Sequence, residues 1–451
     1  MKSSKKIVLM SLFIVIVVLA ILGFNGVFEK ERPNPTTNNL EHNEQPSKNK
    51  LIIKEELPSD ESPKGNSTIP HAVVTTFKGD PSTSRSFTWH TFQRQDRAVI
   101  QLIEGENLAD FRNQTNISTF EGEVSELTLE NNITKAVYKV QATSLQPNTM
   151  YTYRVGDGEE ENWSEFHTFI TAAADVDSFT FINVTDSQGI TEYDFDQWQQ
   201  TLQVAFESFP ESAFIVHNGD LTEHPEEDTS WNYLLEKAKP WITTYPIMPV
   251  TGNHELVKKS ADAFISHFNL PINGAAGVVE GTNYSFDYGP VHFVMLNTES
   301  KIKDQAEWLQ DNLAANEQPW TIVAIHRPAF GGNQDKKVVK HLVPIFDQFN
   351  VDLVLQGHNH EYSRSYPLKG NEVVGNNERG TVYVTTNSSG TKFNEKKASQ
   401  FYHQVHFQNY KPMFAALQIN QNKLIYEAYS IDGKKLDEFT LERNNNPYSE
   451  K

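Results

Sequence analysis

The chain has 451 residues, of which 22% are charged and 38% hydrophobic, a globular composition that excludes disorder throughout. Its formal net charge of −19 argues against nucleic acid or an anionic membrane surface as a general partner, because no basic excess is available to neutralise phosphates. The chain contains no cysteine, which excludes disulfides, thiolate nucleophiles and cysteine-based zinc sites.

The first 27 residues combine positive charge with a long apolar run. Three lysines precede residues 7–24, a run of 18 residues that would be about 27 Å long as a helix. This run is longer than the apolar core of a signal peptide, and no clear cleavage site follows Gly26. Residues 1–27 therefore predict a membrane anchor, with a cleaved signal peptide as the alternative. In both cases the rest of the chain is expected to be exported, either anchored outside the cell membrane or secreted.

Residues 28–69 predict a flexible linker, because they are rich in Asn, Pro, Glu, Lys and Ser and show no sustained apolar periodicity. Residues 70–172 instead contain short runs in which apolar and polar residues alternate, as at 98–102 and 135–140. This alternation predicts a small antiparallel β-sandwich. Residues 145–155, LQPNTMYTYRV, resemble the corner between strands E and F of a fibronectin type III-like domain. The region is similar to the N-terminal domain of purple acid phosphatases.

Residues 178–443 change to apolar, β-rich runs that alternate with helical stretches, the pattern of a layered α/β domain. The main expected strands are 179–184, 213–216, 245–250, 291–296, 321–325 and 352–355, and more follow at 381–386, 414–419 and 424–429. Helices are expected at 194–206, 304–314 and 337–349. The predicted fold class is an α/β domain of layered sheets with helices, preceded by an all-β fibronectin type III-like sandwich.

Five of these strands are followed at once by residues of the types that bind metal ions. The segments are TDSQG at 185–189, HNGD at 217–220, TGNHE at 251–255, HRP at 326–328 and QGHNH at 356–360. Ligands of open α/β sheets lie outside the carboxyl ends of the strands, so five loops of one shared sheet would converge on one edge. Carboxylate, amide and imidazole groups together suit several transition metals, and the set predicts a metal site.

In this order the five segments resemble the motifs of the calcineurin-like metallophosphoesterase superfamily. Together with the upstream sandwich, they make residues 70–441 similar to purple acid phosphatases and their bacterial relatives. The resemblance implies two metal ions, divalent zinc, manganese or iron, that hold a hydroxide for attack on a phosphate ester. It implies that Asp186 and His360 bind the first metal and that Asp220 bridges both. The second metal is implied to be bound by Asn253, His326 and His358.

The resemblance further implies that His254 faces the substrate phosphate and protonates the leaving oxygen. Two carboxylates against two divalent cations leave a positive charge, which attracts a phosphate ester despite the acidity of the chain. Arg327 and Arg364 lie next to ligand segments, where each is either a phosphate contact or part of a structural ion pair.

The sequence departs from the family at the first metal. Superfamily members often carry Asp-x-His in the first segment, where this chain has Gln188, and purple acid phosphatases use a tyrosine three residues after the bridging aspartate, where it has Glu223. Gln188 is either a ligand through its amide oxygen or a residue that supports the ligands. Glu223 and His224 are either substitute ligands or solvated loop residues. Two tyrosines, Tyr193 and Tyr233, are further possible replacements.

The predicted function is that of an exported, metal-dependent phosphomonoesterase of the acid phosphatase type, with a small phosphate ester as its substrate. One alternative is a phosphodiesterase or nucleotidase, because the same metal centre serves both reactions. The other is a surface binding protein with a degenerate site. No nucleic acid partner is expected, a membrane is contacted only through the N-terminal segment, and the oligomeric state is left open.

Overall fold

The computed structural model describes residues 67–443, apart from 130–131, 257–259 and 376–377, together with Tyr448 and Ser449. The described residues belong to one compact unit. The predicted anchor, and all but the last three residues of the predicted linker, lie outside them. Within the described part of the chain, no helix is long and apolar enough to cross a membrane.

Two four-stranded antiparallel sheets form a sandwich from residue 71 to residue 170, with strand orders β1-β2-β6-β5 and β4-β3-β7-β8. Its elements are β1 (His71–Thr76), β2 (Arg85–Thr91), β3 (Val99–Glu104), α1 (Ala109–Asn113), β4 (Ser118–Glu121), β5 (Glu123–Thr128), β6 (Thr134–Ala142), β7 (Met150–Gly156) and β8 (His167–Ile170). The inner faces carry large apolar side chains, among them the stacked rings of Trp89 and Tyr138. The Tyr151 hydroxyl accepts a hydrogen bond from the N–H of Gln146 at 2.9 Å, the bond expected at the E–F corner.

Two seven-stranded mixed sheets follow, with strand orders β11-β10-β9-β21-β22-β23-β24 and β12-β13-β14-β15-β19-β16-β20. The first sheet contains β9 (Ser178–Val184), β10 (Ser212–His217), β11 (Ile247–Pro249), β21 (Met413–Asn420), β22 (Lys423–Ser430), β23 (Lys435–Glu442) and β24 (Tyr448–Ser449). The second contains β12 (Tyr284–Tyr288), β13 (Val291–Met295), β14 (Trp320–Ala324), β15 (Leu353–Gln356), β16 (Tyr362–Ser365), β19 (Val382–Thr385) and β20 (His403–Phe407). A short ribbon joins β17 (Leu368–Lys369) to β18 (Glu372–Val373).

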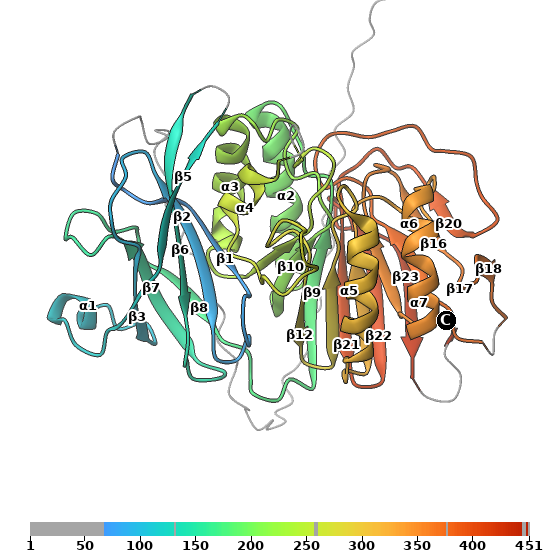
Figure 1. The fold of residues 1–451 in the computed structure, drawn as a ribbon, viewed down its shortest axis with the longest axis horizontal. Helices are drawn as coiled ribbons and strands as arrows, with labels where there is room; N and C mark the ends of the chain where they lie inside the picture. The colour runs from blue at the N-terminus through green and yellow to red at the C-terminus, as the bar shows by residue number, and fades with distance from the viewer. Residues whose placement is uncertain (1–66, 130–131, 257–259, 376–377, 444–447, 450–451) are drawn as a thin grey trace, which may run out of the picture. The chain divides into compact units, whose positions relative to one another are not determined.

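Helices cover the outer faces of the two sheets, so the domain is layered as helix, sheet, sheet, helix (Figure 1). The first sheet packs with α2 (Glu192–Ser208) and α3 (Asp228–Ile242), and the second with α5 (Ile302–Ala314), α6 (Lys336–His341) and α7 (Val343–Phe349). The short helix α4 (Asp262–His267) lies against β2 and β5 of the sandwich. Aromatic rings fill the space between the sheets. The ring centres of Phe181 and Phe214 in the first sheet each lie 5.4 Å from the ring centre of Phe293 in the second. The core therefore holds the two sheets together from the inside.

The five ligand-bearing strands lie in two sheets and not in one shared sheet. β9, β10 and β11 belong to the first sheet, whereas β14 and β15 belong to the second. Strand β21, from the C-terminal part of the chain, pairs with β9 along six residues. It therefore occupies the edge of β9 at which β14 and β15 would have to add to form a single sheet. The predicted helix at 337–349 is divided into α6 and α7, because Pro344 lacks the N–H that a continuous helix requires.

Buried contacts join the sandwich to the α/β domain. The Thr75 hydroxyl donates to the carbonyl of Ile242 at 3.0 Å, and the Tyr153 hydroxyl donates to that of Thr243 at 2.7 Å. A polar cluster lies in the same contact, where Lys135 of β6 forms an ion pair with Asp228 of α3. The imidazoles of His90 and His267 lie there with their ring centres 4.5 Å apart.

Candidate metal centre

The proposed metal ligands lie in loops that begin at the carboxyl ends of strands. Asp186 follows β9, Asp220 follows β10, Asn253 follows β11, His326 follows β14, and His358 and His360 follow β15. Four of these six residues have a left-handed backbone, with φ of 52° at Asp186, 52° at Asp220, 72° at His358 and 51° at His360. Non-glycine residues rarely adopt this conformation, and such strain concentrates at functional sites.

Two glycines let these loops approach one another. A Cβ atom at Gly252 would lie 2.1 Å from Oδ1 of Asp220, and one at Gly357 would lie 2.3 Å from Oγ1 of Thr185. No side chain fits at either position without moving a ligand loop. The glycines of the Gly-Asn-His-Glu and Gly-His-Asn-His segments are thus explained by the closeness of the neighbouring backbone.

The ligand side chains form two clusters that share one carboxylate. One cluster contains Asp220, His326 and His358, the other contains Asp186, Asp220 and His360, and within each the ligand atoms lie within 4.8 Å of one another. Oδ2 of Asp220 lies 3.1 Å from Nε2 of His326, and Oδ1 of Asp186 lies 3.2 Å from Nε2 of His360. Oδ1 of Asn253 lies 3.3 Å from Nε2 of His326 and completes the first cluster. All six predicted ligands are therefore brought together.

Backbone carbonyls set the orientation of the imidazoles. Nδ1 of His326 lies 2.9 Å from the carbonyl oxygen of Asn218, and Nδ1 of His360 lies 2.7 Å from that of Lys392. Because a carbonyl only accepts hydrogen bonds, each Nδ1 carries a proton, so Nε2 is the ring atom that faces the carboxylates and that a metal ion would bind. Metal-binding histidines are commonly oriented in this way.

The electrostatics of the centre favour a cation. Burial alone would lower the pKa of His326, but the carboxylates of Asp220 and Asp186 raise it to about 10. The pKa of Asp186 lies below its usual value although burial opposes this, chiefly because of the nearby His360. A metal ion supplies the same positive charge in place of protons, and a set of carboxylate, amide and imidazole donors fits a transition metal.

Glu255 is a supporting residue that the sequence analysis missed. Its carboxylate accepts hydrogen bonds from the N–H groups of Gly252 at 2.7 Å, Asp220 at 2.9 Å and Leu221 at 2.7 Å. Glu255 thus ties the Asn253 loop to the Asp220 loop. Its position directly after the Gly-Asn-His segment was the one available signal.

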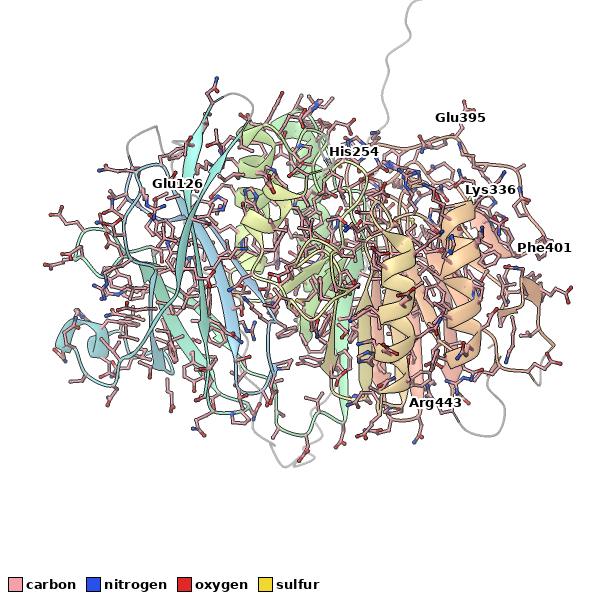
Figure 2. The ribbon with its side chains drawn as sticks, in the orientation of Figure 1. Glu126, His254, Lys336, Glu395, Phe401 and Arg443 are labelled. Atoms are coloured by element: carbon pink, nitrogen blue, oxygen red, sulfur yellow. The ribbon has the colours of Figure 1, made fainter. Side chains whose placement is uncertain are left out.

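A segment after β19, residues 388–397, is the second feature that the sequence analysis missed, and we call it the strap. Ser388 donates its hydroxyl to the carbonyl of Asp186 at 2.6 Å, and the carbonyl of Lys392 holds His360. Lys392 also places its ammonium 2.8 Å from Oε2 of Glu223. Figure 2 labels His254 and the strap residue Glu395 at the same end of the domain. The strap carries no metal-ligand motif that would have revealed it.

The residues considered for the first metal differ in placement. Gln188 is buried, its Nε2 lies 3.4 Å from Oδ2 of Asp220, and its Oε1 has no hydrogen-bond partner among the described residues. An orphaned amide oxygen at this place fits a metal ligand. The carboxylate of Glu223 is instead occupied by Lys392, and His224 is exposed beside Glu226. The solvated interpretation of His224 agrees with this placement.

Of the two arginines considered as phosphate contacts, only Arg327 lies beside the proposed ligands. Arg327 donates to Glu299 at 2.9 Å and to Nε2 of His358 at 3.4 Å, so it lies beside the centre. Arg364 forms an ion pair with Asp437 at 2.7 Å, which is the structural alternative considered for it. Tyr193 is exposed, and Tyr233 packs against a neighbouring phenylalanine ring.

Comparison with known families agrees with this geometry. Residues 179–362 match the family described as Calcineurin-like phosphoesterase. This region is a calcineurin-like phosphoesterase domain. Residues 70–171 match the family described as Purple acid Phosphatase, N-terminal domain, so both predicted resemblances are confirmed. The two matched regions together are similar to metallophosphoesterases, a family whose centres hold two metal ions.

Two relatives show how far this similarity extends. Acid phosphatase type 7 from Danio rerio is 26% identical over 427 residues, which cover 83% of this chain and 91% of the relative. Purple acid phosphatase 15 from Arabidopsis thaliana is 25% identical over 296 residues, which cover 57% of this chain and 54% of the relative. The chain thus matches only about half the length of the plant enzyme.

The fold itself resembles that of a solved structure. Purple acid phosphatase PPD1 from yellow lupin seeds superposes with a TM-score of 0.69 over 83% of this chain and 74% of that chain, at 18% sequence identity. At this identity the likeness concerns the fold alone. It confirms the predicted class, a β-sandwich followed by an α/β metallophosphoesterase domain.

Proposed function

We propose that this chain is a metal-dependent phosphoester hydrolase that acts on phosphomonoesters, as acid phosphatases do. The observation that carries the proposal is the pair of clusters that share Asp220, with Nε2 of His254 only 3.9 Å from Oδ2 of Asp220. The similarity to acid phosphatase type 7 over most of the chain supports it.

The two clusters would hold two divalent ions, of which zinc, manganese and iron fit the donor set. Asp186, Gln188 and His360 would hold one ion, Asn253, His326 and His358 the other, and Asp220 both. When bound, such ions lower the pKa of water and neutralise negative charge on phosphoryl oxygens. Asp220 is suited to the shared position because a carboxylate has two oxygens for two cations.

His254 would supply the proton for the leaving oxygen. Its Nδ1 donates to the carbonyl of Glu223 at 3.0 Å, so the ring is held with Nε2 toward the clusters. Its main-chain N–H also donates to Oδ1 of Asp220 at 3.0 Å, which fixes its distance from the shared carboxylate. A protonated Nε2 at this position can protonate an ester oxygen that leaves from phosphorus.

Arg327 would grip the phosphoryl oxygens. One face of its guanidinium is tied to Glu299, and its Nη1 lies at the edge of the clusters beside His358. Its side chain is 30% exposed, so N–H groups remain accessible to an anion from solvent. A guanidinium in this position suits charge-assisted hydrogen bonds to phosphate.

We also propose that the chain is exported, on the basis of the lysines and the apolar run before residue 25. Full-length protein in bacteria is expected to remain with membranes and to be cleaved by protease added outside the cell. Mature soluble protein that begins shortly after Gly26 would show a cleaved signal peptide instead.

The proposed activity is tested with the full chain loaded with zinc, manganese or ferrous iron. An aryl phosphomonoester is expected to be hydrolysed, a chelator to stop the reaction, and added metal to restore it. Faster hydrolysis of an aryl phosphodiester would make the chain a phosphodiesterase. Hydrolysis of neither ester, with metal bound, would favour a binding protein with a degenerate site.

A further inference from the structure

Lys392 contacts both halves of the candidate site. Its main-chain carbonyl accepts the Nδ1 proton of His360 at 2.7 Å, and its ammonium lies 3.1 and 2.8 Å from the two carboxylate oxygens of Glu223. Glu223 in turn accepts the Nδ1 proton of His254 on its main-chain carbonyl. One residue of the strap thus reaches a proposed metal ligand with its backbone and the loop that orients His254 with its side chain.

The ion pair does not serve mainly to stabilise the fold. The side chains of Lys392 and Glu223 are 42% and 21% exposed, and exposed pairs of this kind contribute little to stability. The pair does determine where the Glu223 carboxylate points, because both of its oxygens face the ammonium. Oε2 of Glu223 remains 3.9 Å from Nε2 of His254, close enough for its position to affect that ring.

We propose that Lys392 is a positioning residue for the reaction, which acts on His254 through Glu223. The inference rests on the proposed function. Where purple acid phosphatases have a tyrosine, this chain has Glu223, and the ammonium of Lys392 in the strap holds the Glu223 carboxylate in place. The pair closes the strap onto the loop after Asp220, and His254 is held in the tautomer and orientation that its role requires.

The test begins with Lys392→Met, which removes the ammonium and keeps the carbonyl that holds His360. We expect kcat to fall about tenfold for aryl phosphates with poor leaving groups and much less for those with good ones, because only the former need a well-placed proton donor. Both metal ions are expected to stay bound. Lys392→Arg is expected to restore most of the activity, and Lys396→Met, on the exposed part of the same strap, to behave as wild type.

A double-mutant cycle separates positioning from a general loss of structure. In a His254→Ala background, Lys392→Met is expected to cost almost nothing further, because the residue through which it acts is gone. Fully additive losses, equal losses for all leaving groups, or loss of a metal ion would each overturn the proposal.

A measurement without metal or substrate distinguishes this inference from the proposed function. Hydrogen–deuterium exchange of the metal-free protein is expected to be faster at residues 220–227 in Lys392→Met and unchanged in Lys396→Met. Unchanged exchange in Lys392→Met would overturn the coupling between strap and loop. A wild-type protein with bound metal and no phosphatase activity would overturn the proposed function and leave this coupling to be judged by exchange alone.

Discussion

The main-chain N–H of His358 donates a hydrogen bond to Oδ2 of Asp186 at 2.9 Å. Asp186 follows β9 of the first sheet, and His358 follows β15 of the second. A proposed ligand of one metal is therefore held by the backbone of a proposed ligand of the other, across the boundary between the sheets. The spacing of the two clusters depends on how the sheets pack.

Asp220→Asn is expected to remove the shared ligand. Metal content should fall, and turnover should drop by about a thousandfold or more, within the range of catalytic effects of single groups. The metal-free variant should unfold at a similar temperature, because the cores of the sheets do not involve this side chain. Elemental analysis, phosphatase assays and thermal unfolding check this, with the exposed Asp304→Asn as control. Near-normal turnover with two metals bound would contradict the shared role.

His254→Ala is expected to lower turnover by about 10²–10⁴-fold while both metals remain bound. Substrates with better leaving groups should lose less, because they need less protonation. The matched control is His224→Ala, an exposed histidine of the neighbouring loop. If elemental analysis of the variant shows one metal equivalent fewer, His254 is a ligand and not a proton donor.

Gln188→Ala is expected to weaken binding of one of the two metals by about 10–100-fold, because it removes an amide oxygen that faces the metal site. Losses of this size are typical when a residue that supports a metal site is substituted. Gln188→His should restore tight binding, because imidazole is the usual donor at this place in the superfamily. Titration calorimetry of metal-free protein measures both effects, with the exposed Gln203→Ala as control. Unchanged affinity for both metals in Gln188→Ala would show that the Gln188 amide does not bind a metal.

Iron-loaded protein is expected to lack an intense visible band. The colour of purple acid phosphatases arises from tyrosinate bound to ferric iron. In this chain Glu223 stands at the position of that tyrosine, and the Glu223 carboxylate forms an ion pair with the Lys392 ammonium. Tyr193 is exposed to solvent. An absorption spectrum of protein with measured iron content tests this. A strong band would show that another tyrosine reaches the metal.

The contact between sandwich and α/β domain is expected to weaken in acid. Burial, aided by the charge of Lys135, lowers the pKa of His90 to about 3, and burial also holds the pKa values of His71 and His267 well below the usual value. In the unfolded chain each titrates near pH 6.5, at roughly the reference value. Below that pH the unfolded chain binds protons that the folded protein does not, so the free energy of unfolding falls as pH falls.

Each of these histidines contributes a slope of up to about 1.4 kcal/mol per pH unit between roughly pH 6 and pH 4. Denaturant unfolding across this range measures the slope. His90→Gln should reduce it, whereas the exposed His224→Gln should not. An unfolding free energy that stays constant from pH 7 to pH 4 would contradict this account.

The proposed metal ligands could be picked out from the sequence because each one lies in a short segment just after the end of a strand. Asp186, Asp220, Asn253, His326, His358 and His360 stand in short segments where strand, turn and ligand are adjacent in the chain. Local patterns of this kind depend on side-chain periodicity and turn residues, which a single sequence displays. The tyrosine corner at Tyr151 was predictable for the same reason, since its partner lies five residues away.

Only the tertiary structure decided how these local pieces meet. The division of the strands between two sheets follows from the pairing of β21 with β9, which joins residues more than 200 positions apart. The ion pair of Lys392 with Glu223 spans 169 positions, so neither residue carries a local signal for the other. Glu255 became recognisable as a support of Asp220 only once the two loops were seen to touch. Contacts between distant segments are set by the packing of whole layers, and this packing has no periodicity along the chain.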